Sequence, residues 1–233
     1  MSRPAGAGGD GGFWNTAEMA ARMGDRPPDE RMLRLLDEEP AIRRVLDAGC
    51  AGGRNAALLA ERGLDVHAFD AASAMVAATR ERLAPLLGEA EAQRRVRLAR
   101  AEDPGAWRPD DGGPFDLILA LGVLQDLPDA PTVRRAIAHA AEALRPGGRV
   151  LVANFGPGSR PAGRPLEPVE GAPHVYLGFA HEERRMTLPD AATLDAWFEA
   201  AGLPPEVATE ASRRPTEQGE RITFNARYHK PAD

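Results

Sequence analysis

The chain has 233 residues, 43% of them hydrophobic, which is enough for the buried core of one domain or of a domain with a cap. A net charge of −6 gives no general attraction for nucleic acid, so no nucleic-acid partner is expected. Cys50, the single cysteine, forms no internal disulfide, and no apolar run approaches the roughly 20 residues of a membrane helix. These features predict a cytoplasmic protein that has no membrane partner.

The first forty residues divide into two parts. Residues 1–12 are rich in glycine and lack hydrophobic periodicity, which predicts a disordered leader. Residues 13–40 are expected to form an N-terminal helical cap, in which Asp29 begins a helix that ends before Pro40. Trp14 either anchors this cap in the core or lies beside a bound substrate, and the sequence leaves both interpretations open.

Residues 45–70 follow the pattern of a strand, a glycine-rich turn, a helix and a second strand. Residues with little or no side chain occupy the turn, where the backbone can bend sharply and a ligand can approach closely: Gly49, Ala51 and Gly53. Asp70 ends the second strand about twenty residues beyond the turn, where an acid suits the hydroxyl groups of a ribose. The pattern predicts a nucleotide site.

The spacing of the turn distinguishes between nucleotide ligands. The dinucleotide pattern G-x-G-x-x-G needs a glycine or alanine where this chain has Arg54. An NAD-dependent oxidoreductase is therefore the weaker alternative.

Further along the chain, a third strand and the segments around it are expected. Ser73 is expected to cap a helix that runs towards Leu87, and residues 96–103 are expected to contain the strand and its acidic end, which includes Ala101 and Glu102. The loop of residues 103–114 contains Trp107, which is either a lid over a bound adenine or surface packing.

The next two strands, residues 115–121 and 150–155, bring polar side chains to the carboxyl edge of the sheet, where ligands bind in doubly wound folds. Gln125 and Asn154 are candidate substrate contacts at this edge. Asp126 is either a third contact or the cap of the following helix.

Residues 156–187 are expected to form an insertion that acts as a lid over the bound substrate. His174 and His181 are candidate general bases, and Arg184 or Arg185 could hold an anionic acceptor. The histidines show no H-x-x-x-H spacing, so no metal site is expected. Beyond the insertion, we expect a helix that ends at Gly202 and closing strands at Val207 and residues 221–228.

These motifs, taken in order, resemble those of the class I S-adenosylmethionine (SAM) methyltransferases. Residues 47–53 (D-A-G-C-A-G-G) resemble the first motif, residues 70–75 its acid-x-x-S-x-M segment, and residues 144–149 (L-R-P-G-G-R) the turn before strand five. The resemblance implies an α/β fold with a Rossmann-like, doubly wound, seven-stranded sheet that is mostly parallel and has an antiparallel last strand. The methyltransferase domain would span residues 41–233. Residues 52–55 and 64–70 are locally similar to the small-molecule branch that includes the tellurite-resistance methyltransferases.

The resemblance implies SAM as cofactor, S-adenosylhomocysteine (SAH) as product, and a small molecule as acceptor through an oxygen, nitrogen or sulfur atom. The cofactor residues that it implies are Asp47, Gly49, Ala51, Gly53, Asp70, Ala71, Ala101, Glu102 and Leu121. The candidate substrate contacts are Trp14, Gln125, Asn154, Tyr176, Arg184 and Arg185. A SAM-binding regulatory or partner subunit remains an alternative, and a monomer and a homodimer are both open.

Overall fold

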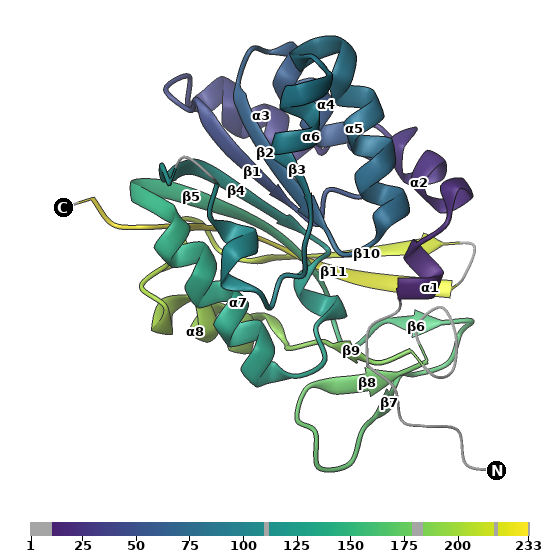
Figure 1. Cartoon of the computed structure of the whole chain (residues 1–233). Coiled ribbons are helices and arrows are strands. Elements are labelled where there is room, and N and C mark those ends of the chain that lie inside the picture. Colours follow the sequence, from purple (N-terminus) through teal and green to yellow (C-terminus); the bar gives the residue numbers. More distant parts are fainter. Residues whose placement is uncertain (1–10, 110–111, 179–183, 217–218, 233) are drawn as a thin grey trace.

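The computed structural model describes residues 11–109, 112–178, 184–216 and 219–232. In this part of the chain, seven strands form the central sheet in the order β10-β11-β5-β4-β1-β2-β3 (Figure 1). The strands are β1 (Arg44–Ala48), β2 (Asp65–Asp70), β3 (Val96–Leu98), β4 (Phe115–Leu121), β5 (Leu144–Phe155), β10 (Glu210–Thr216) and β11 (Gly219–His229).

The direction of the strands confirms the predicted fold. β1 pairs in parallel with β2 and β4, and the parallel ladder continues to β3 and β5. β11 is antiparallel to β5 and to β10. The predicted seven-stranded, mostly parallel sheet with an antiparallel last strand is therefore correct.

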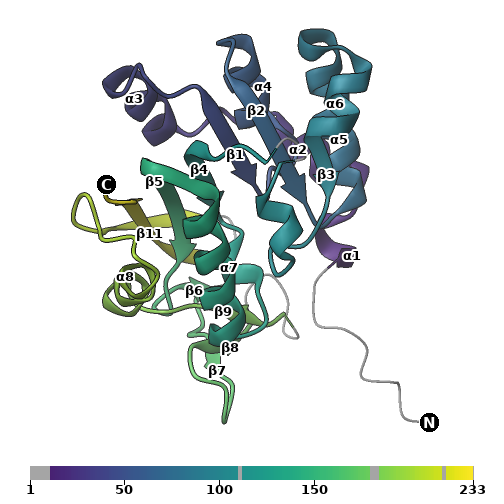
Figure 2. The same ribbon diagram turned by 60° about the vertical axis from the view of Figure 1, so that its left-hand side comes forward.

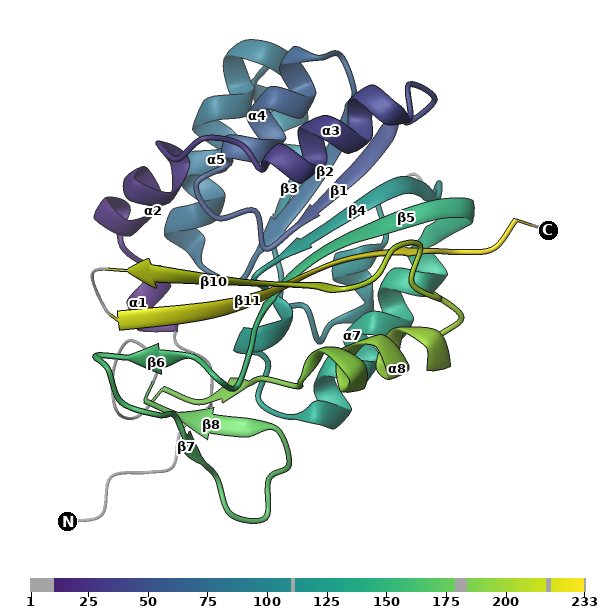
Figure 3. The same cartoon turned by 180° about the vertical axis from the view of Figure 1, so that it is seen from behind.

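Helices cover both faces of the sheet, as the two turned views show (Figures 2 and 3). One face packs against α7 (Ala130–Ala143) and α8 (Ala191–Ala200), and the other against α3 (Glu30–Glu38), α4 (Arg54–Glu61), α5 (Ser73–Leu87) and α6 (Glu89–Arg95).

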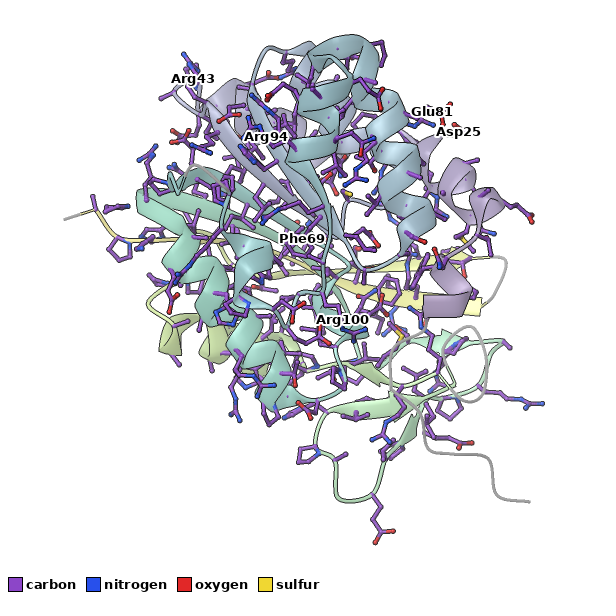
Figure 4. The ribbon with its side chains drawn as sticks, in the orientation of Figure 1. Asp25, Arg43, Phe69, Glu81, Arg94 and Arg100 are labelled. Atoms are coloured by element: carbon purple, nitrogen blue, oxygen red, sulfur yellow. The ribbon has the colours of Figure 1, made fainter. Side chains whose placement is uncertain are left out.

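Alternate residues of the central strands supply the two hydrophobic cores. Leu46 and Ile118 belong to the core under α7 and α8, whereas Val45 and Leu117 belong to the core under α3, α4 and α5. Side chains alternate along a strand, so a sheet covered on both sides has apolar residues at nearly every position. Figure 4 shows Phe69 inside these layers, while Asp25 and Glu81 project from the surface.

The N-terminal cap consists of α1 (Gly11–Trp14), α2 (Ala17–Gly24) and α3. Asp29 accepts a hydrogen bond from the backbone N–H of Arg31 and caps α3 as predicted. The predicted leader of residues 1–12 extends too far, because Gly11 and Gly12 already belong to α1, whose aromatic end packs on the domain. Residues 1–10 lie outside the described residues.

The cap of α5 differs from the prediction. Ser73 is the first residue of the helix, and its side chain makes no capping bond to a backbone N–H. Asn15 takes this role from the N-terminal cap, because its Oδ1 accepts from the backbone N of Ala74 at 2.8 Å and from Ser73 Oγ at 3.0 Å. The cap of α5 is therefore supplied from 59 residues away in the sequence.

The insertion after β5 folds into its own small sheet. β6 (Arg160–Pro161) pairs with the start of β11, and β7 (Glu167–Pro168), β8 (Val175–Leu177) and β9 (Met186–Thr187) form a three-stranded sheet. Its apolar side packs against Phe155, the last residue of β5, and is made of Leu166, Tyr176, Met186 and Leu188. The insertion and α1 both lie at the carboxyl edge of the parallel strands (Figures 1 and 3).

Three other local predictions need correction, and one helix was not predicted. Trp107, in the short 3-10 helix η1 (Pro104–Trp107), is neither a lid nor surface packing, because its ring lies edge-on to Phe69 in the core. α6 was not predicted. β5 already begins at Leu144. Val207 is exposed and precedes β10, since the first closing strand starts at Glu210.

Candidate active site

The glycine-rich turn between β1 and α4 is fixed by backbone hydrogen bonds to the end of β2. The N–H groups of Gly49 and Cys50 both donate to the carbonyl oxygen of Phe69, at 2.9 Å and 3.0 Å. Gly49 and Gly53 have φ angles of 71° and 81°, and Ala51 has 49°. The left-handed region suits glycine, so two of the three residues match the backbone that the turn requires.

Two glycines of the turn also make room for neighbouring helices. A Cβ atom at Gly52 would lie 2.2 Å from the carbonyl oxygen of Ala20, and one at Gly53 would lie 2.9 Å from Thr79. α2 therefore rests directly on the turn, and α5 packs against its far side. Gly52 and Gly53 are therefore explained by the close packing of α2 and α5, as well as by the space that a ligand needs.

Asp70 shapes the same turn from the end of β2. Its Oδ2 accepts from the backbone N of Ala51 and its Oδ1 from the backbone N of Ala72, both at 2.9 Å. Each carboxylate oxygen keeps one lone pair for a further donor. Burial raises the pKa of Asp70, although the backbone donors of Ala72 and Ala51 oppose this shift. Asp70 and the adjacent Ala71 thus border the turn, as the sequence predicted.

Asp47 lies at the end of β1, 2% exposed, and its Oδ2 has no hydrogen-bond partner among the described residues. Burial raises its pKa to about 7, while the positive charge of Arg54 opposes the shift. A buried carboxylate oxygen without a donor is costly, and a hydrogen-bond donor or a cation on a ligand would remove this cost.

The residues predicted to hold the adenine lie beyond β3. Ala101 is buried, and its carbonyl oxygen accepts from Trp107 Nε1 at 2.9 Å. Glu102 makes an ion pair with Arg100 at 2.6 Å. Leu121 ends β4 beside Ala153 of β5. Trp107 thus fixes the backbone of this turn from the core side, which the sequence did not indicate.

Gln125 and Asn154 both lie at the carboxyl edge of the sheet, and each makes a hydrogen bond to the backbone of Phe155. Gln125, in the 3-10 helix η2 (Leu124–Asp126), accepts from the backbone N of Phe155 through Oε1 at 2.7 Å. Asn154 is 1% exposed, and its Oδ1 has no partner among the described residues. The ends of β1 and β5 therefore each present a buried oxygen atom without a donor.

Arg184 does not fill the predicted role of a free anion-binding group. It is 4% exposed, donates through Nη2 to Asp126 Oδ1 at 2.5 Å, and lies 5.3 Å and 5.2 Å from the ring centres of Phe13 and Trp14. One arginine thus connects α1, η2 and the insertion. We call the side chains of Arg184, Asp126, Phe13 and Trp14 the latch.

The remaining predicted residues lie apart from the glycine turn. His174 has a φ of 65° and contacts the ring of Trp197 in α8 at 5.4 Å, so its position argues against a catalytic role. Tyr176 packs in the apolar core of the insertion. Arg185 is exposed, with its charge near Asp129. His181 lies outside the described residues.

Two asparagines near the site were also missed. Asn15 caps α5, and Asn55 Oδ1 accepts from the backbone N of Asp29 at 3.0 Å, which ties α3 to the start of α4. Asn15 follows the Phe13–Trp14 pair, but nothing in the sequence indicates that it caps a helix 59 residues away.

Comparison with known proteins identifies the family. A sequence model of the methyltransferase domain family matches residues 19–206. Ubiquinone biosynthesis O-methyltransferase of Xylella fastidiosa (strain 9a5c) is 32% identical over 184 residues, which cover 77% of this chain and 68% of that protein. The protein of the same name from Xanthomonas axonopodis pv. citri (strain 306) is 33% identical over 168 residues, or 71% of this chain and 64% of that protein. The chain belongs to this methyltransferase family.

Solved structures share the fold. A SAM-dependent methyltransferase from Methanosarcina mazei aligns with a TM-score of 0.68 at 18% identity, over 89% of this chain and 100% of that one. The N-methyltransferase NodS of Bradyrhizobium japonicum, in complex with SAH, aligns with a TM-score of 0.56 at 18% identity, over 93% of this chain and 99% of that one.

The family and the fold together define the chain as a SAM-dependent methyltransferase. The site residues fit this cofactor, because Asp47 offers an unpaired carboxylate oxygen and Asp70 has lone pairs for the ribose hydroxyls. The local likeness to the tellurite-resistance methyltransferases stays a prediction. No described helix is both long and apolar enough to cross a bilayer.

Proposed function

We propose that the chain transfers the methyl group of SAM to a hydroxyl oxygen of a small molecule held between the end of β5 and the insertion. The unpaired Oδ1 of Asn154 carries this proposal, because a buried oxygen without a donor suits the proton of an acceptor hydroxyl. Oxygen as the acceptor atom is supported by the relatives, which are O-methyltransferases.

The proposed roles at the cofactor edge follow from the contacts described above. Asp70 receives the ribose hydroxyls, Asp47 Oδ2 faces the positively charged methionyl end, and the segment containing Ala101 and Glu102 borders the adenine. Gly49, Ala51 and Gly53 keep the backbone open to this ligand, and Leu121 lies at the end of β4.

SAM supplies a methyl group that is already activated by a positive sulfur. The chain then has two tasks, which are to align the acceptor with that carbon and to exclude water. Asn154 Oδ1 accepts a hydrogen bond from the acceptor hydroxyl, and the hydroxyl proton passes to solvent when the oxygen has taken the methyl group. Gln125 holds the backbone at the end of β5, so that Asn154 keeps its position. The latch holds the insertion against α1, and we assign the insertion of residues 156–187 the role of a lid.

The partners and location are part of the same proposal. The acceptor is a small molecule, nucleic acid is not bound, and the chain acts as a monomer or homodimer. The single cysteine is buried and unpaired, which fits a reducing compartment such as the cytoplasm.

The test has two stages. Calorimetry should show that the purified chain binds SAM and SAH, and a coupled assay of SAH release should then find turnover among hydroxyl compounds but not among their methyl ethers. Binding of NAD but not SAM would overturn the proposal. SAM binding without turnover on any oxygen, nitrogen or sulfur acceptor would leave a SAM-binding regulatory subunit instead.

A further inference from the structure

Three arginines gather where β11 extends past the end of β5. Thr223 is the residue of β11 that pairs with Phe155, so Arg221 lies two residues beyond the end of β5. Arg221 pairs across the hairpin with Arg214 of β10. Like charges directly opposite each other on neighbouring strands destabilise a sheet, so this pair is unfavourable unless something compensates it.

The third member comes from the N-terminal cap. Arg26 follows α2, and its positive charge acts on Arg221. Burial, followed by the charges of Arg26 and Arg214, lowers the pKa of Arg221. The adjoining ends of strands β10 and β11 lie beside α1 and below α2 (Figures 1 and 3), so the end of the N-terminal cap that carries Arg26 is on the same side of the molecule. We call Arg26, Arg214 and Arg221 the arginine cluster.

No carboxylate neutralises the cluster among the described residues. Arg213, the neighbour of Arg214, pairs with Glu220, and Asp25, the neighbour of Arg26, pairs with Arg82. The adjacent acids are therefore bound to other arginines.

Arg221 is also not an ordinary solvated surface cation. Its Nε is buried and has no acceptor among the described residues, and its guanidinium lies 5.0 Å from the ring centre of Phe155. Leaving a buried charged donor without an acceptor is more costly than leaving a neutral one. A group with several oxygen atoms and a negative charge would remove this cost and the repulsion within the cluster.

The position of the cluster suggests which ligand supplies the anion. β11 is three strand steps from β1 in the sheet, about 14 Å at about 4.8 Å per step, and the cofactor extends from β1 towards β2 and β3. Phe155, under Arg221, packs against the apolar core of the insertion. The cluster therefore borders the acceptor side of the site.

We infer that Arg221, with Arg26 and Arg214, binds the carboxylate or phosphate group of an anionic acceptor, whose apolar part lies towards Phe155 and the insertion. Arginine suits both oxyanions, because its planar fork of donors matches their geometry. This inference rests on the proposed function, since it names the class of acceptor for the same site.

The test uses binding, so it needs no turnover. The chain is first saturated with SAH, which fills the site for the cofactor's own carboxylate, and benzoate, phenyl phosphate or neutral benzamide is then added. A ligand that binds the folded state raises the unfolding midpoint in a concentration-dependent way, from which an affinity is obtained. We expect benzoate or phenyl phosphate to bind and benzamide not to bind.

Variants then assign the binding to the cluster. Arg221→Gln and Arg26→Gln should each weaken binding of the anion by about 10- to 100-fold, the usual loss for hydrogen bonds to a charged group. Arg213→Gln is the matched control on the same hairpin, and we expect a change of about threefold or less, as for an exposed ion pair. Unfolding midpoints measured without ligand show whether each variant is folded. If Arg221→Gln does not fold, Arg26→Gln tests the cluster in its place.

Three results would overturn the inference. The first is an equal response to benzoate, phenyl phosphate and benzamide. The second is a loss of SAH affinity in Arg221→Gln as large as the loss of anion affinity, which would assign the cluster to the cofactor carboxylate. The third is RNA binding through the same arginines without a response to either small anion. Failure of SAH itself to bind would instead count against the proposed function, so the two failures can be distinguished.

Discussion

The cofactor edge and the acceptor edge of the sheet are assembled in different ways. At the cofactor edge, the bond from Ala51 to Asp70 joins residues 19 apart, inside one βαβ unit. At the acceptor edge, Asp126 and Arg184 are 58 residues apart, and the bond between Ser159 and Ile222 spans 63. A short sequence motif can therefore predict the cofactor edge. The acceptor edge joins distant segments of the chain, so no motif describes it.

The largest expected effect is a loss of turnover at the acceptor edge that leaves cofactor binding nearly unchanged. Residues 162–185 are replaced by a short Gly/Ser linker, which keeps β6 paired with β11. SAM affinity should stay within about threefold, while turnover falls by about 100-fold or more because the acceptor loses its positioning. Calorimetry and the SAH-release assay measure the two quantities.

Arg184→Met is the matched control for this replacement, because it opens the latch and leaves the insertion in place. We expect it to reduce turnover by less than the replacement does. Full activity of the linker variant would contradict the proposed lid.

A second prediction concerns the cofactor edge alone. Asp70→Ala removes the acceptor for two backbone N–H groups and for the ribose, so SAM affinity should fall by about 10- to 100-fold. Asp70→Asn retains one carbonyl oxygen and should lose less. Calorimetry with SAM and SAH provides the measurement, and an unchanged affinity in Asp70→Ala would remove Asp70 from the site.

Gly52→Ala tests whether α2 and the glycine turn act as one unit. The added methyl group would meet the backbone of Ala20, which cannot rotate away, so we expect a loss of about 1 to 3 kcal/mol in the free energy of unfolding. Gly105→Ala is the control, because nothing lies within 4 Å of its Cβ position. Urea denaturation of both variants shows the difference, and equal stabilities would mean that α2 does not rest on the turn.

The last prediction is a pH dependence from Asp47. Its folded-state pKa is raised from 3.8 to about 7, so the stability that it contributes is complete below about pH 4 and is lost as the pH rises through about 7. The methionyl ammonium of SAM favours the ionised form, so SAM affinity should rise with pH up to about 7, by at most about tenfold per unit, and then level off.

Asp47→Asn should flatten this dependence relative to the unmodified chain, because the side chain no longer titrates. Unfolding midpoints with and without SAH between pH 5 and pH 8 measure the difference. Parallel pH profiles of the two proteins would show that Asp47 does not face the methionyl end.

The sequence by itself determined the topology and most of the cofactor edge. Apolar strands such as β1 and β4, the acid that ends β2 and the glycine turn are local patterns, since their partners lie within one supersecondary unit. The same locality made the cap at Asp29 predictable, because this side chain accepts from a backbone N–H only two residues further on.

Only the tertiary structure decided which arginine is paired and which is not. The sequence made Arg184 a candidate for holding an anionic acceptor, but the fold buries it against Asp126, Phe13 and Trp14. Arg221 was predicted only as part of a closing strand. The fold places Arg221 opposite Arg214 and against Phe155, and in the described part of the chain its buried Nε has no acceptor. Burial and pairing are properties of neighbours brought together from distant segments, so composition and spacing could not predict them.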